Sequence, residues 1–320
     1  MTARPQPLRG TSTHPSHRPV EPALGYEMAV PIVGTDSAGV FISWLIGQEL
    51  HTMVTNESIA RVGIDPDGVH QQRVAGRRLR CHLRHFRDLV EPAWLEVTMS
   101  ELRWIGTSLG TVRDLEVMRD VLSACAASLP STDVQHLEPL FAQVTHERNR
   151  AHADLQRALD SDRYVQLLAS LTLAAAETPL IDDVRQNALD LARSTAARAV
   201  ARLDKSVQRL GPTPTDIDLH FVRLRAKRAR FASEAAIPLI GNQARKLAKS
   251  LANVQSVLGT QHDAVVAHHW VRAHALHEEP SVNFSAGMVA GLLRNASQQA
   301  AREFPAVWNK ASREKLRSWL

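Results

Sequence analysis

The feature that most constrains this chain is a pattern of residues that occurs twice, about 150 positions apart. Each copy begins with a histidine, at His70 and at His220, followed by an arginine three residues later and a basic residue four residues after that. Downstream of each copy, a Leu-Gly pair is followed by an aspartate four residues after the glycine. Because two separate features recur at nearly the same offset, the sequence predicts a duplicated unit.

The spacing of apolar side chains indicates what is duplicated. From Asp36 onward, apolar residues recur at steps of three and four, which is the period of an amphipathic helix. The pairs Asp65-Pro66 and Thr215-Asp216 are typical of helix starts. The sequence therefore predicts an all-α fold of about ten to twelve helices, in two pseudo-symmetric antiparallel bundles of about 150 residues each.

The N-terminal segment and the composition predict the limits of the folded part and the cellular location of the protein. Residues 1–30 are rich in proline and lack apolar periodicity, so we expect a disordered N-terminal leader. The folded part is then 31–320, with one repeat over about 31–175 and the other over about 176–320. We find no apolar run long enough for a bilayer, no signal peptide, and only two cysteines, too few for a disulfide framework. These features predict a cytoplasmic protein with no membrane partner.

The helix predicted after Pro66 carries a row of basic side chains, the first basic stripe. Steps of three and four residues place these side chains on one face of the helix, with no acidic residue among them. An apolar stripe lies one residue away, so the basic stripe borders the core. The apolar stripe comprises Leu79, Leu83, Phe86 and Val90, and the first basic stripe comprises His70, Arg73, Arg77, Arg80, Arg84 and Arg87. The second basic stripe comprises His220, Arg223, Lys227 and Arg230, and Glu234 stands at its next position.

Three explanations of the basic stripes are open: a solvated charged face, pairing with the protein's own acids, or an anionic ligand. We expect internal pairing for one or two arginines, with Glu101, Asp114, Glu234 and Asp263 as the candidate acids. Like charges one helical turn apart repel each other, so unpaired arginines favour an anionic ligand. Of the 38 Lys and Arg residues, 32 are Arg, the side chain that binds phosphate oxygens in a fixed geometry. A genome that prefers Arg codons would explain this excess equally well.

The sequence resembles the CHAD domain family, the conserved histidine alpha-helical domain, over about residues 31–320. The resemblance is carried by motifs at Val69–Arg80, Glu101–Trp104, Leu109–Val117, Leu219–Glu234 and Val254–Asp263. It implies an all-helical fold of two similar bundles with a basic channel between them that binds inorganic polyphosphate. Two positions depart from the pattern, since Ala229 and Phe231 stand where family members often have Leu and Tyr. The ExExK motif of the triphosphate-tunnel domain is missing, so we do not expect the triphosphatase activity attached to that domain.

The resemblance also implies which residues touch the ligand. The polyphosphate-binding candidates are His70, Arg73, Arg77, Arg78, Arg80, Arg84, His220, Arg223, Lys227, Arg228 and Arg230. The residue pattern itself, apart from the resemblance, adds secondary candidates on adjoining helices that could widen the basic track: Arg103, Arg113, Lys246 and Lys249.

Two questions stay open at this level. The two repeated histidines could contact the ligand or make a structural hydrogen bond; neither has an Asp, Glu or Cys at metal-ligand spacing, so we expect no metal site. The glycine of each Leu-Gly pair could end a helix or allow close packing.

We therefore predict a polyphosphate-binding protein that is not an enzyme, has no cofactor and no catalytic residue, and associates with polyphosphate granules. Nucleic acid is the alternative polyanion, although the stripes lack the aromatic side chains on which bases stack. A metal-dependent polyphosphate hydrolase is the second alternative, and it would need a carboxylate cluster beside the basic residues.

Overall fold

The computed structural model describes residues 31–181, 186–276 and 278–320, and the predicted leader lies outside them. The described chain is all-α, as predicted, and within it two isolated bridges, Ser37–Asn187 and Val90–Leu180, are the extent of β-structure. There are thirteen helices in this part, one more than the upper estimate from sequence. The difference lies in short helices, since four of the thirteen have six residues or fewer.

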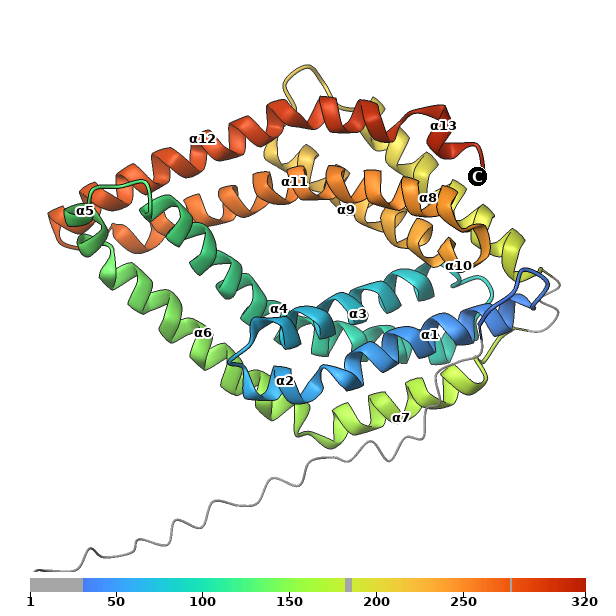
Figure 1. Ribbon diagram of the computed structural model, residues 1–320. Coiled ribbons are helices and arrows are strands. Elements are labelled where there is room, and N and C mark those ends of the chain that lie inside the picture. The colour runs from blue at the N-terminus through green and yellow to red at the C-terminus, as the bar shows by residue number, and fades with distance from the viewer. Residues whose placement is uncertain (1–30, 182–185, 277) are drawn as a thin grey trace, which may run out of the picture.

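The helices form two groups that follow the chain order (Figure 1). The first group contains α1 (Ala38–Thr55), α2 (Glu57–Val62), α3 (Pro66–His85), α4 (Pro92–Ala126), α5 (Ser131–His136), α6 (Glu138–Leu159) and α7 (Asp162–Ala176). The second contains α8 (Ala188–Gln208), α9 (Asp216–Ala235), α10 (Ile237–Ile240), α11 (Asn242–Ala275), α12 (Pro280–Ala311) and α13 (Glu314–Arg317). In Figure 1 the long hairpin of α4 and α6 runs away from its group and meets the hairpin of α11 and α12, where α5 contacts α12.

Corresponding helices of the two groups have similar lengths. Helices α3 and α9 both have 20 residues, and α4 and α11 have 35 and 34. The side chain of Asp65 caps α3, with Pro66 as its first residue, and Thr215 caps α9 in a capping box with Asp218, so both predicted helix starts are confirmed. These matched lengths are what a duplicated unit would produce.

Two apolar cores hold the helices together. The main core contains buried residues from both groups, including Leu79 and Leu83 of α3 and Val222 of α9. The second core lies where the two long hairpins meet. Its members include Met118 and Leu122 of α4, Leu140 and Val144 of α6, Ala267 and Val271 of α11, and Val282 and Val289 of α12.

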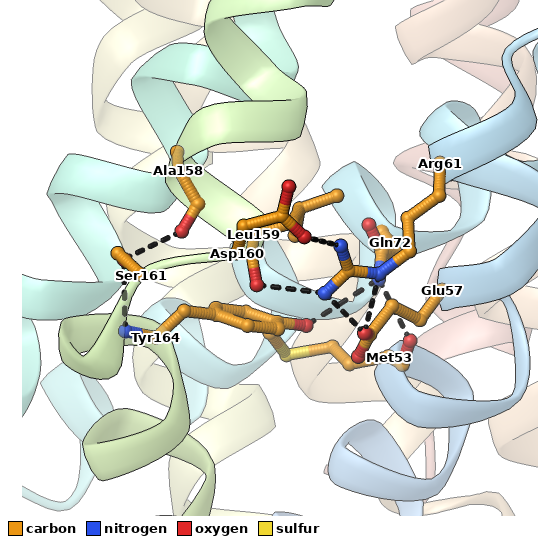
Figure 2. Close-up of polar contacts among 9 residues, drawn as sticks. All are labelled: Met53, Glu57, Arg61, Gln72, Ala158, Leu159, Asp160, Ser161 and Tyr164. Atoms are coloured by element: carbon orange, nitrogen blue, oxygen red, sulfur yellow. Dashed lines mark hydrogen bonds and ion pairs between the residues drawn. The ribbon is translucent and has the colours of Figure 1, made fainter. Parts of the chain in front are cut away.

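Helix α3 is fixed against its neighbours by a buried amide. Gln72 is fully buried, and its Nε2 donates to the carbonyl oxygen of Met53 at 2.9 Å and to the hydroxyl of Tyr164 at 3.4 Å (Figure 2). Near its start, α3 approaches α2 closely, because a Cβ added at Gly68 would lie 2.4 Å from the backbone nitrogen of Ala60. These contacts fix the rotation of α3 about its axis and so the direction of its basic stripe.

An ion-pair network joins α2 to the loop before α7, beside this amide (Figure 2). The Arg61 guanidinium donates to Glu57 Oε1 at 2.8 Å, to the Leu159 carbonyl oxygen at 2.7 Å, and to Asp160. The network therefore joins α2 to the chain that connects α6 and α7.

The prediction that Arg87 belongs to the first basic stripe is wrong. Helix α3 ends at His85, and Phe86 is its C-cap. Beyond Phe86 the backbone pairs with the segment after α7, because Glu91 N donates to the Pro179 carbonyl oxygen at 2.9 Å and Ile181 N donates to the Leu89 carbonyl oxygen at 3.0 Å. Arg87 is consequently exposed and pairs with its neighbour Asp88 at 3.2 Å.

Candidate functional site: a basic cluster between the repeated helices

The two basic stripes come together because α3 and α9 contact each other. Four half-buried side chains form what we call the central cluster: Arg73 and Arg77 from α3, and Arg223 and Lys227 from α9. Burial, Arg223 and Arg113 lower the pKa of Arg73 against the opposing effect of Asp114. Side chains that are 150 residues apart in sequence thus share one electrostatic environment.

Within the central cluster, the pKa values of Arg77 and Lys227 are lowered the most. Burial, together with Arg73 and Arg223, lowers the pKa of Arg77 to about 10. Burial, together with Arg77, Arg223 and Arg73, lowers the pKa of Lys227 to about 7. Both effects disfavour the charged forms, and a bound anion would reverse them.

Each repeat supplies one aspartate to the central cluster. Asp114 Oδ1 on α4 lies 2.6 Å from Arg73 Nη2, and Asp263 Oδ1 on α11 lies 4.0 Å from Arg223 Nη2. Burial and the nearby Asp114 raise the pKa of Asp263, and Arg223 opposes them. The aspartate of each Leu-Gly-x3-Asp motif therefore pairs with the first arginine of its own repeat, which explains why the two motifs recur together.

A third acid, Glu234, joins the two helices directly. Its carboxylate accepts from Arg78 Nη2 of α3 at 2.9 Å and from Arg230 Nε of α9 at 2.6 Å. Both guanidinium groups also lie over the ring of Phe231, at 5.5 and 5.9 Å from its centroid. Two of the predicted ligand residues, Arg78 and Arg230, thus already share one internal partner.

Internal pairing leaves several predicted residues without an acid. Within the first basic stripe, Arg73 pairs with the candidate acid Asp114, in line with the prediction of one or two paired arginines. The candidate acid Glu101 pairs instead with Arg163, which is outside both stripes. Within the described chain, no carboxylate lies within ion-pair distance of Arg77, Arg80, Arg84, Lys227 or Arg228.

Two glycines of α4 lie next to arginines of α3. A Cβ added at Gly106 would lie 3.8 Å from Arg80 Nη1, and one added at Gly110 would lie 3.8 Å from Arg73 Nε. Gly110 is in the interior of α4, as Gly259 is in the interior of α11, so the alternative that these glycines end a helix is wrong. At both Gly106 and Gly110 the distance would admit a Cβ, so these contacts do not require glycine.

The two repeated histidines differ in their partners. His220 Nδ1 lies 3.3 Å from His262 Nδ1, and burial followed by Arg223 lowers the pKa of His262 to about 4. The Nδ1 atom of His70 is buried and has no hydrogen-bond partner among the described residues, and burial and then Arg113 lower the pKa of His70.

His262 was not among the residues predicted from sequence. The residue precedes Asp263 just as Arg113 precedes Asp114, so His262 and Arg113 occupy equivalent positions next to the equivalent histidines. Both are the last of the three variable positions in the repeated Leu-Gly-x3-Asp motif, and comparing these positions between the repeats would have found His262.

The secondary candidates fall into two sets. Arg103 is exposed on α4 beside Arg80, and Arg113 pairs with the buried Glu116 at 3.2 Å, close to His70. Lys246 and Lys249 are exposed in the first turns of α11, and no hydrogen bond or ion pair of the described chain joins them to the central cluster. The cluster therefore extends along α4 and not along the start of α11.

The described residues contain neither a metal-binding cluster nor a membrane-spanning helix. In residues 31–181, 186–276 and 278–320, no three His, Cys, Asp or Glu side chains are grouped to hold a metal ion. Over the same ranges, none of the helices is both long and apolar enough to cross a membrane.

Comparison with known proteins identifies the family. The chain is 29% identical over 230 residues to the uncharacterized proteins MT2285 and Rv2226 of two Mycobacterium tuberculosis strains, which covers 68% of this chain and 41% of theirs. It superposes on PptA from Streptomyces chartreusis with a TM-score of 0.71 and 21% identity, over 84% of this chain and 98% of PptA. The CHAD domain from the plant Ricinus communis gives a TM-score of 0.72 and 25% identity, over 88% and 94%. Residues 45–272 match the CHAD domain family, and the chain therefore belongs to it.

Proposed function

We propose that the protein binds inorganic polyphosphate at the central cluster, without enzymatic activity. One observation carries the proposal: Arg77 and Lys227, from two different repeats, are half-buried side by side with no acid paired to either in the described chain. An isolated cation of this kind is costly when solvent is partly excluded. A ligand rich in negative charge removes that cost.

A linear polyphosphate fits this arrangement better than a single anion. Its phosphates repeat along a flexible chain, and the cations of α3 repeat at each helical turn, about 5 Å apart. Guanidinium groups bind phosphate oxygens through charge-assisted hydrogen bonds, so several units can be held at once. Binding of this kind weakens steeply with salt, as it does for nucleic acids. Binding of polyphosphate in the cytoplasm would place the protein on polyphosphate granules.

The test removes the two unpaired cations while keeping the fold. We expect the double variant R77Q/K227Q to bind long-chain polyphosphate about 100-fold more weakly, the loss of two charge-assisted contacts. The matched control R150Q/K310Q removes the same charge from exposed positions on α6 and α12. Equal affinity of the two variants, measured by fluorescence titration at physiological salt, would contradict the proposal.

Two further assays separate the alternatives. In competition at physiological salt, we expect polyphosphate to displace RNA from the protein, and the reverse order would favour the nucleic-acid alternative.

For the hydrolase alternative, the carboxylates beside the cluster are Asp114 and Asp263, and each is paired with an arginine. We expect no shortening of long-chain polyphosphate after incubation with the protein and Mg²⁺ or Mn²⁺; shortening that is lost in D114N/D263N would establish an enzyme.

A further inference from the structure

Helix α8 carries a third basic stripe that the repeated motifs do not include. Arg198, Arg202 and Lys205 are spaced by four and three residues, which puts them on one face of the helix. All three side chains are exposed, and no acid occupies a position within this stripe.

This stripe meets basic residues of two other helices, because α9 packs against both α8 and α3. We call the assembled set the α8 group; it comprises Arg84 of α3, Arg198 and Arg202 of α8, and Arg225 and Arg228 of α9. Burial, and then Arg84, Arg225 and Arg202, lower the pKa of Arg228. Burial, His82, Arg202, Arg228 and Arg198 lower the pKa of His85 to about 3. Three helices thus contribute cations to one surface.

The protein supplies little to neutralise the α8 group. Within the described residues, no carboxylate lies within ion-pair distance of Arg84, Arg202, Arg225 or Arg228. Arg198 donates to the neutral hydroxyl of Thr195 at 3.3 Å. Five like charges on three packed helices repel one another, so this surface also favours a polyanion.

The α8 group is continuous with the central cluster along α3. Arg77, Arg80 and Arg84 follow one another at steps of three and four residues, with no acid among them. The span from Arg77 to Arg84 is about 10 Å on a helix. Burial and then Arg84 and Arg103 lower the pKa of Arg80, and Arg80 in turn contributes to the lowered pKa of Arg77, so Arg80 interacts with both sets.

We propose that the α8 group is a second binding surface for the same polyphosphate chain, which reaches it from the central cluster along Arg80 and Arg84. This inference rests on the proposed function. Long chains then contact both surfaces, whereas a chain as short as tripolyphosphate occupies only the more enclosed central cluster. The protein consequently discriminates between polyphosphates by length.

The test compares two ligands on the full chain. We expect R198Q/R202Q to bind long-chain polyphosphate about tenfold more weakly, as for two exposed ion pairs, and to bind tripolyphosphate as the unsubstituted protein does. The control R193Q/R150Q removes the same charge, with Arg193 on the other side of α8 and exposed. Circular dichroism checks that all variants remain helical.

The possible outcomes separate the two proposals. The second surface is refuted if R198Q/R202Q binds long chains normally, or loses affinity equally for both ligands, while R77Q/K227Q still binds more weakly than the unsubstituted protein. If the unsubstituted protein binds neither ligand, or if R77Q/K227Q binds both normally, the proposed function itself fails. Loss of long-chain affinity alone supports the second surface.

Discussion

The carboxylate of Asp114 lies 2.6 Å from the guanidinium of Arg73, on the edge of the central cluster. The aspartate is 68% exposed and the arginine only 14%, so the acid covers a cation that is otherwise enclosed. A phosphate that binds Arg73 has to displace this carboxylate or accept its repulsion. Under the proposed function Asp114 therefore competes with the ligand, and Asp263 holds the corresponding position beside Arg223.

Replacing Asp114 should strengthen binding. We expect D114N to raise the affinity for polyphosphate about threefold, because an exposed ion pair contributes less than about 1 kcal/mol. The control D120N removes an exposed acid two turns further along α4. Titration with long-chain polyphosphate measures the effect, and a weaker D114N complex would show that Asp114 orients Arg73 for the ligand.

Glu234 stabilises the fold, because it links α3 to α9 through Arg78 and Arg230. We expect E234Q to lower the free energy of unfolding by about 1 kcal/mol, since it leaves two close guanidinium groups without their shared acid. Urea denaturation measures the loss. In a double-mutant cycle with R78Q, purely additive effects would argue against a direct interaction.

The affinity for polyphosphate should depend on pH through Lys227. The pKa of this residue is about 7, against an ordinary value of 10.5. An anion binds the charged form, so affinity is highest at acidic pH and falls as the pH rises through about 7. We expect K227R to reduce this dependence, because arginine stays charged. Titrations across this pH range compare the two proteins, and identical profiles would assign the dependence to other groups.

The lowered pKa of Lys227 also affects the stability of the unliganded protein, which rises with pH where the affinity for polyphosphate falls. Between about 7 and 10.5 the unfolded chain keeps a proton on Lys227 that the folded protein has released. The free energy of unfolding therefore rises with pH across this window. Thermal denaturation of the protein and of K227M checks this, and the slope should be smaller in K227M.

Two glycines should respond in opposite ways to alanine. At Gly110 a Cβ meets Arg73 at an ordinary contact distance, so we expect G110A to gain about 0.5–1 kcal/mol from its helix propensity while still binding ligand. At Gly68 a Cβ would lie 2.4 Å from the Ala60 backbone nitrogen, and G68A should cost about 2 kcal/mol or more. Melting temperatures distinguish them, and equal values would contradict the packing described for α3.

Local sequence predicted the helices well, and it predicted the basic residues that α3 and α9 bring together. The caps at Asp65 and Thr215 depend on neighbouring residues alone, and a stripe on a helix follows directly from residue spacing. The course of the chain at Arg87 did not follow from spacing, because the backbone beyond Phe86 bonds to residues 179–181, which are distant in sequence. Spacing predicts which residues share a face but not where packing ends the helix.

The ion-pair partners and neighbouring charges of the basic stripes could be identified only from the tertiary structure. Glu234 continues the stripe of its own helix, yet it also pairs with Arg78 of another helix because α3 and α9 contact each other there. The arginines of α8 have no counterpart in the repeated motifs, so the duplication did not draw attention to them. A charge is recognisable in sequence, whereas its neighbours on other helices are not.

The second core has a consequence for the charged site, although none of its residues is charged. On α4, Asp114 is followed one turn later by Met118, and on α11, Asp263 is followed one turn later by Ala267; both apolar residues belong to this core. Its packing thus holds the two aspartates, and the cations paired with them, at a set separation against mutual repulsion. Replacing one aliphatic side chain of the second core by another can therefore change the affinity of the basic cluster for anions, and the salt dependence of that affinity, without changing a single charge.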